Sequence, residues 1–235
     1  MNPAVGFFDS GIGGLGVARA FLRLRPVARV FYVADWEHCP YGGRPDSEIL
    51  DRVRLICSRL ESLGSRVIVM ACNTASAVAL RQMRRERPSV RFVGMEPAVK
   101  PAAAAAAARG RRAVGVLATA HTLRGGLFRE TSARHASGIK VVAAEGKGFV
   151  ELAESGDLCS ADARETVRRV LAPLLDAGCD PIVLGCTHYP LLLPLLRDEA
   201  PGVEFVDPAE AVARRAAALW DEIRVGSEPN AGGGR

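Results

Sequence analysis

The strongest constraint on the fold is the alternation of short apolar runs with longer amphipathic stretches. Eight such runs are rich in β-branched residues, which is typical of strands that are buried on both faces. They lie at residues 5–8, 30–34, 67–71, 90–94, 114–118, 139–143, 182–185 and 203–206. Repeated strand–helix–strand units of this kind predict an α/β fold, with mostly parallel sheets flanked by helices.

Two of the intervening stretches have a clear helical pattern. In residues 46–63 the apolar side chains recur at steps of one, three or four, with Asp46 and Ser47 as candidate caps and Gly64 after the end. Residues 101–108 are a proline followed by alanines only, and alanine has the highest helix propensity of all residues. This second stretch therefore predicts a capped helix rather than a linker.

The sequence also contains an internal repeat. Residues 64–72 resemble residues 178–186, and residues 5–10 resemble residues 114–119. In both matches the two segments are separated by a similar number of residues, which predicts two related α/β lobes. Buried strands can also resemble one another by chance.

We expect the first lobe to cover residues 1–96 and the second lobe to cover residues 97–206. The boundary falls where the strand at 90–94 has ended and Glu96 and Pro97 follow. The glycine-rich end of the chain, residues 226–235, predicts a flexible tail.

Composition and charge exclude several classes of protein. The net charge of +5 is mild, and the densest basic cluster, at Arg81, Arg84, Arg85 and Arg87, predicts a solvated helix face rather than a nucleic-acid site. The chain has no uninterrupted apolar run of about eighteen residues, so we expect no membrane span. The N-terminus has no pattern of a signal peptide, and the cysteines form no Cys-x-x-Cys pair. We therefore expect a cytoplasmic protein with reduced thiols.

A glycine-rich segment follows the first predicted strand. Residues 11–16 fit the G-x-G-x-x-G pattern of dinucleotide-binding proteins, and Asp35 lies at about the expected distance. Asp9, however, would place a carboxylate beside the pyrophosphate, whereas a cationic group such as an ammonium would be favoured there. The alternative is that the glycines only permit a tight turn between strand and helix.

Two cysteines occupy matching positions in the repeat. Cys72 and Cys186 each follow a predicted strand, at the sheet edge where α/β proteins bind ligands. We expect each thiol to lie at a helix N-terminus, which would lower its pKa. Two acid/base groups of one type, one on each face of a carbon atom, suit the inversion of a stereocentre. A structural role in the core and a disulfide are the alternatives. The four histidines have no zinc-type spacing, and we expect no metal site.

Five segments resemble the glutamate racemases within the aspartate/glutamate racemase family, and together they extend over most of the chain. They are Asp9-Ser-Gly-Ile-Gly-Gly-Leu15, Asp35 to Gly42, Ala71-Cys-Asn-Thr-Ala-Ser76, Glu96-Pro97 and Gly185-Cys-Thr-His-Tyr-Pro-Leu191. The resemblance implies two lobes with the active site in the cleft between them, and residues 207–225 packing back onto the first lobe. It also implies a cofactor-independent, two-base interconversion of L- and D-glutamate that supplies D-glutamate for peptidoglycan, by an enzyme that can form a homodimer.

The resemblance assigns roles to individual residues. Cys72 and Cys186 match the two catalytic cysteines, with Asp9, His188 and Glu154 as their helpers. The residues that match substrate contacts are Asp9, Ser10, Tyr41, Gly42, Asn73, Thr74, Thr119, Thr122, Thr187 and His188. Asn73, Thr74 and Thr187 are suited to bind a carboxylate.

The chain departs from the family pattern in the second lobe. Gly125 and Phe128 replace a serine and a tyrosine, and Gly146-Lys147 replaces a Cys-Pro pair. Three alternatives to a glutamate racemase stay open. They are a racemase for another acidic amino acid such as aspartate, a non-catalytic homologue that binds an amino acid or a partner, and a dinucleotide oxidoreductase.

Overall fold

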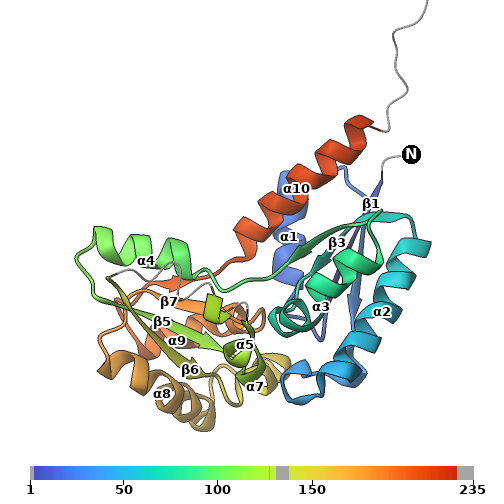
Figure 1. The fold of residues 1–235 in the computed structure, drawn as a ribbon. Helices are drawn as coiled ribbons and strands as arrows, with labels where there is room; N and C mark the ends of the chain where they lie inside the picture. The colour runs from blue at the N-terminus through green and yellow to red at the C-terminus, as the bar shows by residue number, and fades with distance from the viewer. Residues whose placement is uncertain (1–2, 127, 131–137, 227–235) are drawn as a thin grey trace, which may run out of the picture.

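The computed structural model describes residues 3–126, 128–130 and 138–226, and it contains two four-stranded parallel sheets (Figure 1). The first sheet has the order β2-β1-β3-β4, and the second has the order β6-β5-β7-β8. The strands are β1 (Ala4–Asp9), β2 (Val30–Ala34), β3 (Ser65–Met70), β4 (Arg91–Gly94), β5 (Ala113–Ala118), β6 (Lys140–Glu145), β7 (Ile182–Gly185) and β8 (Phe205–Val206). Each overlaps a predicted strand, and the predicted α/β fold class is confirmed.

The helices around the first sheet carry the apolar faces that the sequence indicated. They are α1 (Leu15–Leu24), α2 (Asp46–Ser62), α3 (Asn73–Glu86) and α10 (Ala209–Gly226), with short 3-10 turns at Trp36–His38 and Tyr41–Gly43. The prediction that Asp46 or Ser47 caps α2 is wrong, because Pro45 is the N-cap and no side chain caps the helix. The Asp46 carboxylate instead contacts Nε2 of His121, in the second lobe, at 2.6 Å.

The second sheet is covered in the same way. Its helices are α4 (Val99–Ala108), α5 (Ala120–Arg124), α7 (Phe149–Ser155), α8 (Ala161–Asp176) and α9 (Leu193–Glu199), with a 3-10 turn at Tyr189–Leu192. The alanine run is helical as predicted, but α4 begins earlier, at Val99, and no side chain caps it. None of the described helices is long and apolar enough to cross a membrane.

The internal repeat of the sequence corresponds to matching strand pairs. Phe8 lies opposite Met70 where β1 pairs with β3, and Leu117 lies opposite Leu184 where β5 pairs with β7. These four residues are the ones that the repeat aligns, so the two sheets share both strand order and register. The strands that precede Cys72 and Cys186 are therefore equivalent.

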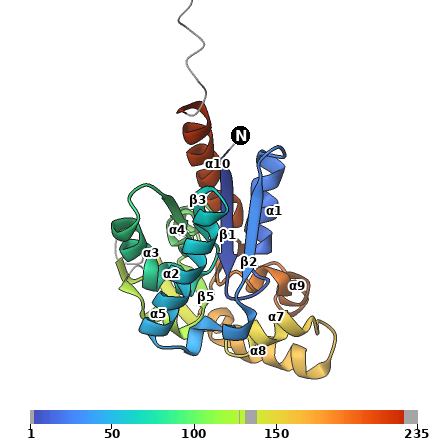
Figure 2. The same cartoon turned by 90° about the vertical axis from the view of Figure 1, so that its right-hand side faces the viewer.

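The last described helix returns to the first lobe. α10 packs against α1 and against β3 and β4 (Figures 1 and 2). Trp220 is 1% exposed, and its indole nitrogen donates a hydrogen bond to the carbonyl oxygen of Pro3 at 2.8 Å. These contacts support our proposal that residues 207–225 belong with residues 1–96, and that residues 97–206 form the other lobe. Of the proposed tail, residues 227–235 lie outside the described residues.

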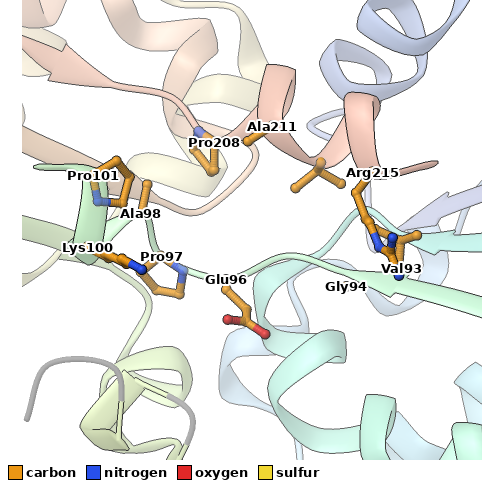
Figure 3. A pocket seen from close by; sticks show the side chains of 11 residues that line it. Val93, Gly94, Glu96, Pro97, Ala98, Lys100, Pro101, Pro208, Ala211 and Arg215 are labelled. Carbon is orange, nitrogen blue, oxygen red and sulfur yellow. The ribbon is translucent and has the colours of Figure 1, made fainter. Parts of the chain in front are cut away.

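The chain crosses between the lobes at two adjacent places. Pro97 lies on the first crossing and Pro208 on the second, and both line a cavity of about 360 Å³ (Figure 3). Glu96, Lys100 and Arg215 also line this cavity.

Candidate active site

The two thiols of the repeat lie at equivalent strand ends. Cys72 comes just after β3 and is the N-cap of α3, where its sulfur accepts a hydrogen bond from the Ala75 amide at 3.5 Å. Cys186 directly follows β7. Both side chains are buried, with only 5% of Cys72 and 7% of Cys186 exposed. The structure therefore gives each lobe one buried thiol at the carboxyl end of its sheet.

The expectation that these positions lower the thiol pKa values is wrong. Burial raises the pKa of Cys72, and the nearby Asp9 carboxylate raises it further, although the Ala75 amide acts in the opposite direction. Burial also raises the pKa of Cys186, and the charge of Asp9 adds to this. Desolvation of a thiolate outweighs the hydrogen bonds from the nearby backbone amides, so both groups are neutral thiols in the resting site.

Asp9 links the glycine-rich segment to the second lobe. Its Oδ1 accepts a hydrogen bond from the Ser10 amide at 2.7 Å, and its Oδ2 accepts one from the Gly14 amide at 2.6 Å. The hydroxyl of Thr187, which follows β7, donates to the same Oδ2 at 3.1 Å. Burial raises the pKa of Asp9 despite these hydrogen bonds. Ser10 and Thr187 thus contact Asp9 directly.

His188 and Glu154 form a second polar group beside Cys186. The imidazole Nδ1 lies 3.9 Å from the Cys186 sulfur, and Nε2 lies 2.6 Å from Oε1 of Glu154. Burial tends to raise the pKa of Glu154, but hydrogen bonds from the Ile12 amide and from His188 outweigh it and lower the pKa. Glu154 is therefore a carboxylate, and it holds the His188 ring in place by its contact with Nε2. The other ring nitrogen, Nδ1, faces the Cys186 thiol.

The threonines and Asn73 lie where the lobes meet. The Thr74 hydroxyl is 3.1 Å from the Thr119 hydroxyl of the other lobe, which is 3.0 Å from the Thr122 hydroxyl. Asn73 is 3% exposed, and neither polar atom of its amide has a hydrogen-bond partner among the described residues. A buried amide without a partner costs about 1–3 kcal/mol, so Asn73 is prepared to bind a polar ligand.

Tyr41 and Gly42 are placed less directly. The Tyr41 hydroxyl donates to Oδ2 of Asp35 at 2.7 Å, and Arg52 pairs with the same carboxylate. This network fixes the turn that carries Gly42. A Cβ added at Gly42 would lie 3.4 Å from the Cβ of Thr119. The structure therefore brings Gly42 to the junction of the lobes and engages the Tyr41 hydroxyl with Asp35.

The second lobe packs so closely against the glycine-rich segment that there is no room for side chains at Gly11 and Gly13. A Cβ at Gly11 would lie 1.9 Å from Oε1 of Glu154, and one at Gly13 would lie 2.7 Å from the backbone nitrogen of His188. Side chains and backbone of the other lobe thus occupy the space beside these glycines. The alternative reading of the segment, as a tight turn, fits this packing better than a pyrophosphate site does.

Sequence reasoning missed two residues of this site. Trp36 donates its indole N–H to Oε2 of Glu154 at 3.2 Å, and the Cys39 sulfur lies 3.9 Å from Oε1. Both residues belong to the segment Asp35 to Gly42 that carries part of the family resemblance. That position was the only signal for them, because neither residue has a characteristic spacing to Glu154.

Two like α/β lobes, each with one buried thiol at the carboxyl end of its sheet, fit an isomerase of the two-lobed racemase type. Comparison with known proteins agrees, since the family model described as Asp/Glu/Hydantoin racemase matches residues 37–216. The chain belongs to this family.

Similar proteins carry more specific names. The chain is 46% identical to a glutamate racemase of Roseiflexus sp. over 220 residues, which cover 93% of this chain and 79% of the relative. It is 45% identical to a glutamate racemase of Ectopseudomonas mendocina over 212 residues, which cover 90% and 80%. The crystal structure of Escherichia coli glutamate racemase, in complex with L-glutamate and the activator UDP-MurNAc-ala, matches with a TM-score of 0.85 at 36% identity and covers 94% of this chain and 83% of that one.

Proposed function

We propose that the protein interconverts L- and D-glutamate by a two-thiol acid/base mechanism without a cofactor. The observation that carries this proposal is the pair of buried thiols, Cys72 and Cys186, at equivalent strand ends of the two lobes. The names of the relatives support glutamate as the substrate. The product D-glutamate would serve peptidoglycan synthesis in the cytoplasm.

In each turnover one thiolate takes the proton from the α-carbon, and the opposite thiol gives its own proton to the other face. A C–H bond breaks and an S–H bond forms on the first side, while an S–H bond breaks and a C–H bond forms on the second. The two sulfurs then have exchanged protonation states. Because burial raises the pKa values of both thiols, a thiolate that does form is a strong base.

The surrounding polar groups suit the other parts of glutamate. We propose that Asn73, Thr74 and Thr187 bind a carboxylate, aided by the amides at the start of α3, and that Asp9 orients the ammonium group. The unpartnered amide of Asn73 supports this assignment. Ser10, Tyr41, Gly42, Thr119 and Thr122 would complete the pocket.

Circular dichroism of L-glutamate, D-glutamate and L-aspartate, each incubated with the purified protein, tests the proposal. We expect glutamate of either hand to lose its signal without added pyridoxal phosphate and after exhaustive chelation. Faster loss with aspartate would favour the alternative substrate, and no loss with either would favour a non-catalytic homologue.

The cysteine variants test the mechanism. Cys72→Ser and Cys186→Ser should each lower racemisation in both directions by at least about a hundredfold, because a hydroxyl is too weak an acid to exchange protons near neutral pH. Cys159→Ser is the matched control, because Cys159 is exposed. A folded Cys72→Ser or Cys186→Ser protein with near wild-type activity would rule out the two-thiol mechanism. Sedimentation of the same preparations would test the expected homodimer.

A further inference from the structure

Three potential metal ligands from distant parts of the sequence meet at the edge of the site. The Cys39 sulfur, a carboxylate oxygen of Glu154 and a ring nitrogen of His188 all lie within 4.8 Å of one another. Cys39 follows the turn Trp36–His38, Glu154 lies on α7, and His188 follows β7. His188 is 2% exposed, and the other two side chains are partly buried.

These three ligand types favour some metal ions over others. A thiolate, an imidazole and a carboxylate are the three ligand types that bind Zn²⁺ in proteins, whereas Mg²⁺ and Ca²⁺ prefer oxygen ligands only. Three protein ligands leave the fourth position of a tetrahedral ion open to water. We propose that Cys39, Glu154 and His188 form an inhibitory site for a zinc-type divalent cation.

The distances are compatible with such an ion. Oε1 of Glu154 and Nε2 of His188 are 2.6 Å apart and share a proton, and the cation would take the place of that proton, which moves to Nδ1 of the same imidazole. Zinc bonds of about 2.0 Å to nitrogen and oxygen and about 2.3 Å to sulfur require these two atoms to separate by less than an ångström. Cys39 loses its thiol proton to the solvent as the ion binds.

The groups around the ligands already have the required orientation. The Ile12 amide, at 2.9 Å, and the Trp36 indole, at 3.2 Å, hold the Glu154 carboxylate in place. In proteins, hydrogen bonds from neighbouring groups orient the side chains that bind a metal ion. The site therefore needs little rearrangement to accept the cation.

Metal binding would change what His188 can do for Cys186. With the ion on Nε2, the single proton of the neutral imidazole lies on Nδ1, which faces the Cys186 sulfur at 3.9 Å. His188 could then no longer accept a proton from that thiol, and Glu154 would be neutralised by the ion. The cation is thus an inhibitor and is not needed for the reaction; this effect on activity rests on the proposed racemisation, but binding does not.

Cobalt(II) provides a direct measurement of binding, because a thiolate bound to cobalt gives an intense near-ultraviolet absorption band. We expect the reduced wild-type protein to develop this band with one equivalent of Co²⁺ and to lose it when Zn²⁺ is added. Cys39→Ser should abolish the band, whereas Cys159→Ser, Cys72→Ser and Cys186→Ser should retain it. A band that persists in Cys39→Ser, or no band in the wild type, would overturn the site.

Inhibition is measured separately with Zn²⁺ in the glutamate assay. Cys39→Ser should require at least about tenfold more Zn²⁺ than the wild type for half-inhibition, with each protein's inhibition measured relative to its own activity without metal. Equal sensitivity of Cys39→Ser and the wild type would show that zinc acts elsewhere, for example on Cys72. If the protein proves inactive on glutamate, the cobalt titration still decides whether the site exists.

Discussion

The two thiols of the site face different chemical groups. Cys72 lies near the Asp9 carboxylate, which raises its pKa, whereas Cys186 faces the imidazole of His188. A carboxylate strengthens a neighbouring thiolate as a base, while an imidazole can exchange a proton with a thiol. Two equivalent positions in the fold therefore carry unequal helpers.

This inequality predicts opposite isotope effects for two variants. Asp9→Asn removes the charge near Cys72 and should slow proton transfer there, whereas His188→Asn should slow it at Cys186. In deuterated water, one variant should exchange the α-proton of one enantiomer faster than it racemises that enantiomer, and the other variant should favour the opposite enantiomer. Nuclear magnetic resonance and circular dichroism, recorded on the same samples, measure the two rates. If both variants slow exchange and racemisation of both enantiomers by the same factor, Asp9 and His188 only bind the substrate.

The raised thiol pKa values also predict the pH dependence. Racemisation needs one thiolate, and a group with a raised pKa is protonated until the pH approaches that pKa. We therefore expect kcat/KM to rise steadily between about pH 6 and 9. Asp9→Asn leaves the burial that raises the pKa of Cys72 but removes the charge that raises it further, so the rising limb of this variant should lie at lower pH. A wild-type profile that falls over this range would contradict a thiolate base.

The loop between β1 and α1 must approach the second lobe closely. A methyl group at Gly13 would lie 2.7 Å from backbone atoms of Thr187 and His188, whereas nothing lies within 4 Å of the same position at Gly16. Gly13→Ala should therefore disturb the contact between the lobes and reduce kcat at least about tenfold. Gly16→Ala is the matched control and should be active and slightly more stable, because Gly16 lies in α1. Equal activities of the two variants would show that the close approach is not needed.

The order of the elements could be predicted from the sequence because buried parallel strands are continuous apolar runs, and all eight were found. The equivalent positions of Cys72 and Cys186 in the two lobes could be predicted from the repeat. The pKa values of these thiols could not be predicted, because desolvation depends on how closely the lobes pack. The cluster of Cys39, Glu154 and His188 was missed for a similar reason, since it forms only when three distant segments meet. Helix caps were also missed, because Asp46 contacts His121 instead of its own helix.

Helix α10 joins the end of the described chain to its beginning, and this has a consequence for the stability of the whole molecule. Trp220 packs among residues of α1 and β1 and bonds to Pro3. Trp220→Ala should lower the free energy of unfolding by about 3–5 kcal/mol, as measured by chemical denaturation. Leu55→Ala, at a site that is 57% exposed, is the control and should change it by less than about 0.5 kcal/mol. Similar small effects in both would argue against placing residues 207–225 with the first lobe.

The shared strand order of the two sheets bears on how the proposed reaction runs in a cell. Mirror-image substrates have identical free energies in water, so their equilibrium mixture is even and no catalyst can bias it. β3 and β7 place their thiols at equivalent positions, so either thiol can take a proton while the other returns one, although their polar neighbours differ. Such an enzyme has no preferred direction of its own, and its net flux is set entirely by whichever reaction consumes one of the two enantiomers.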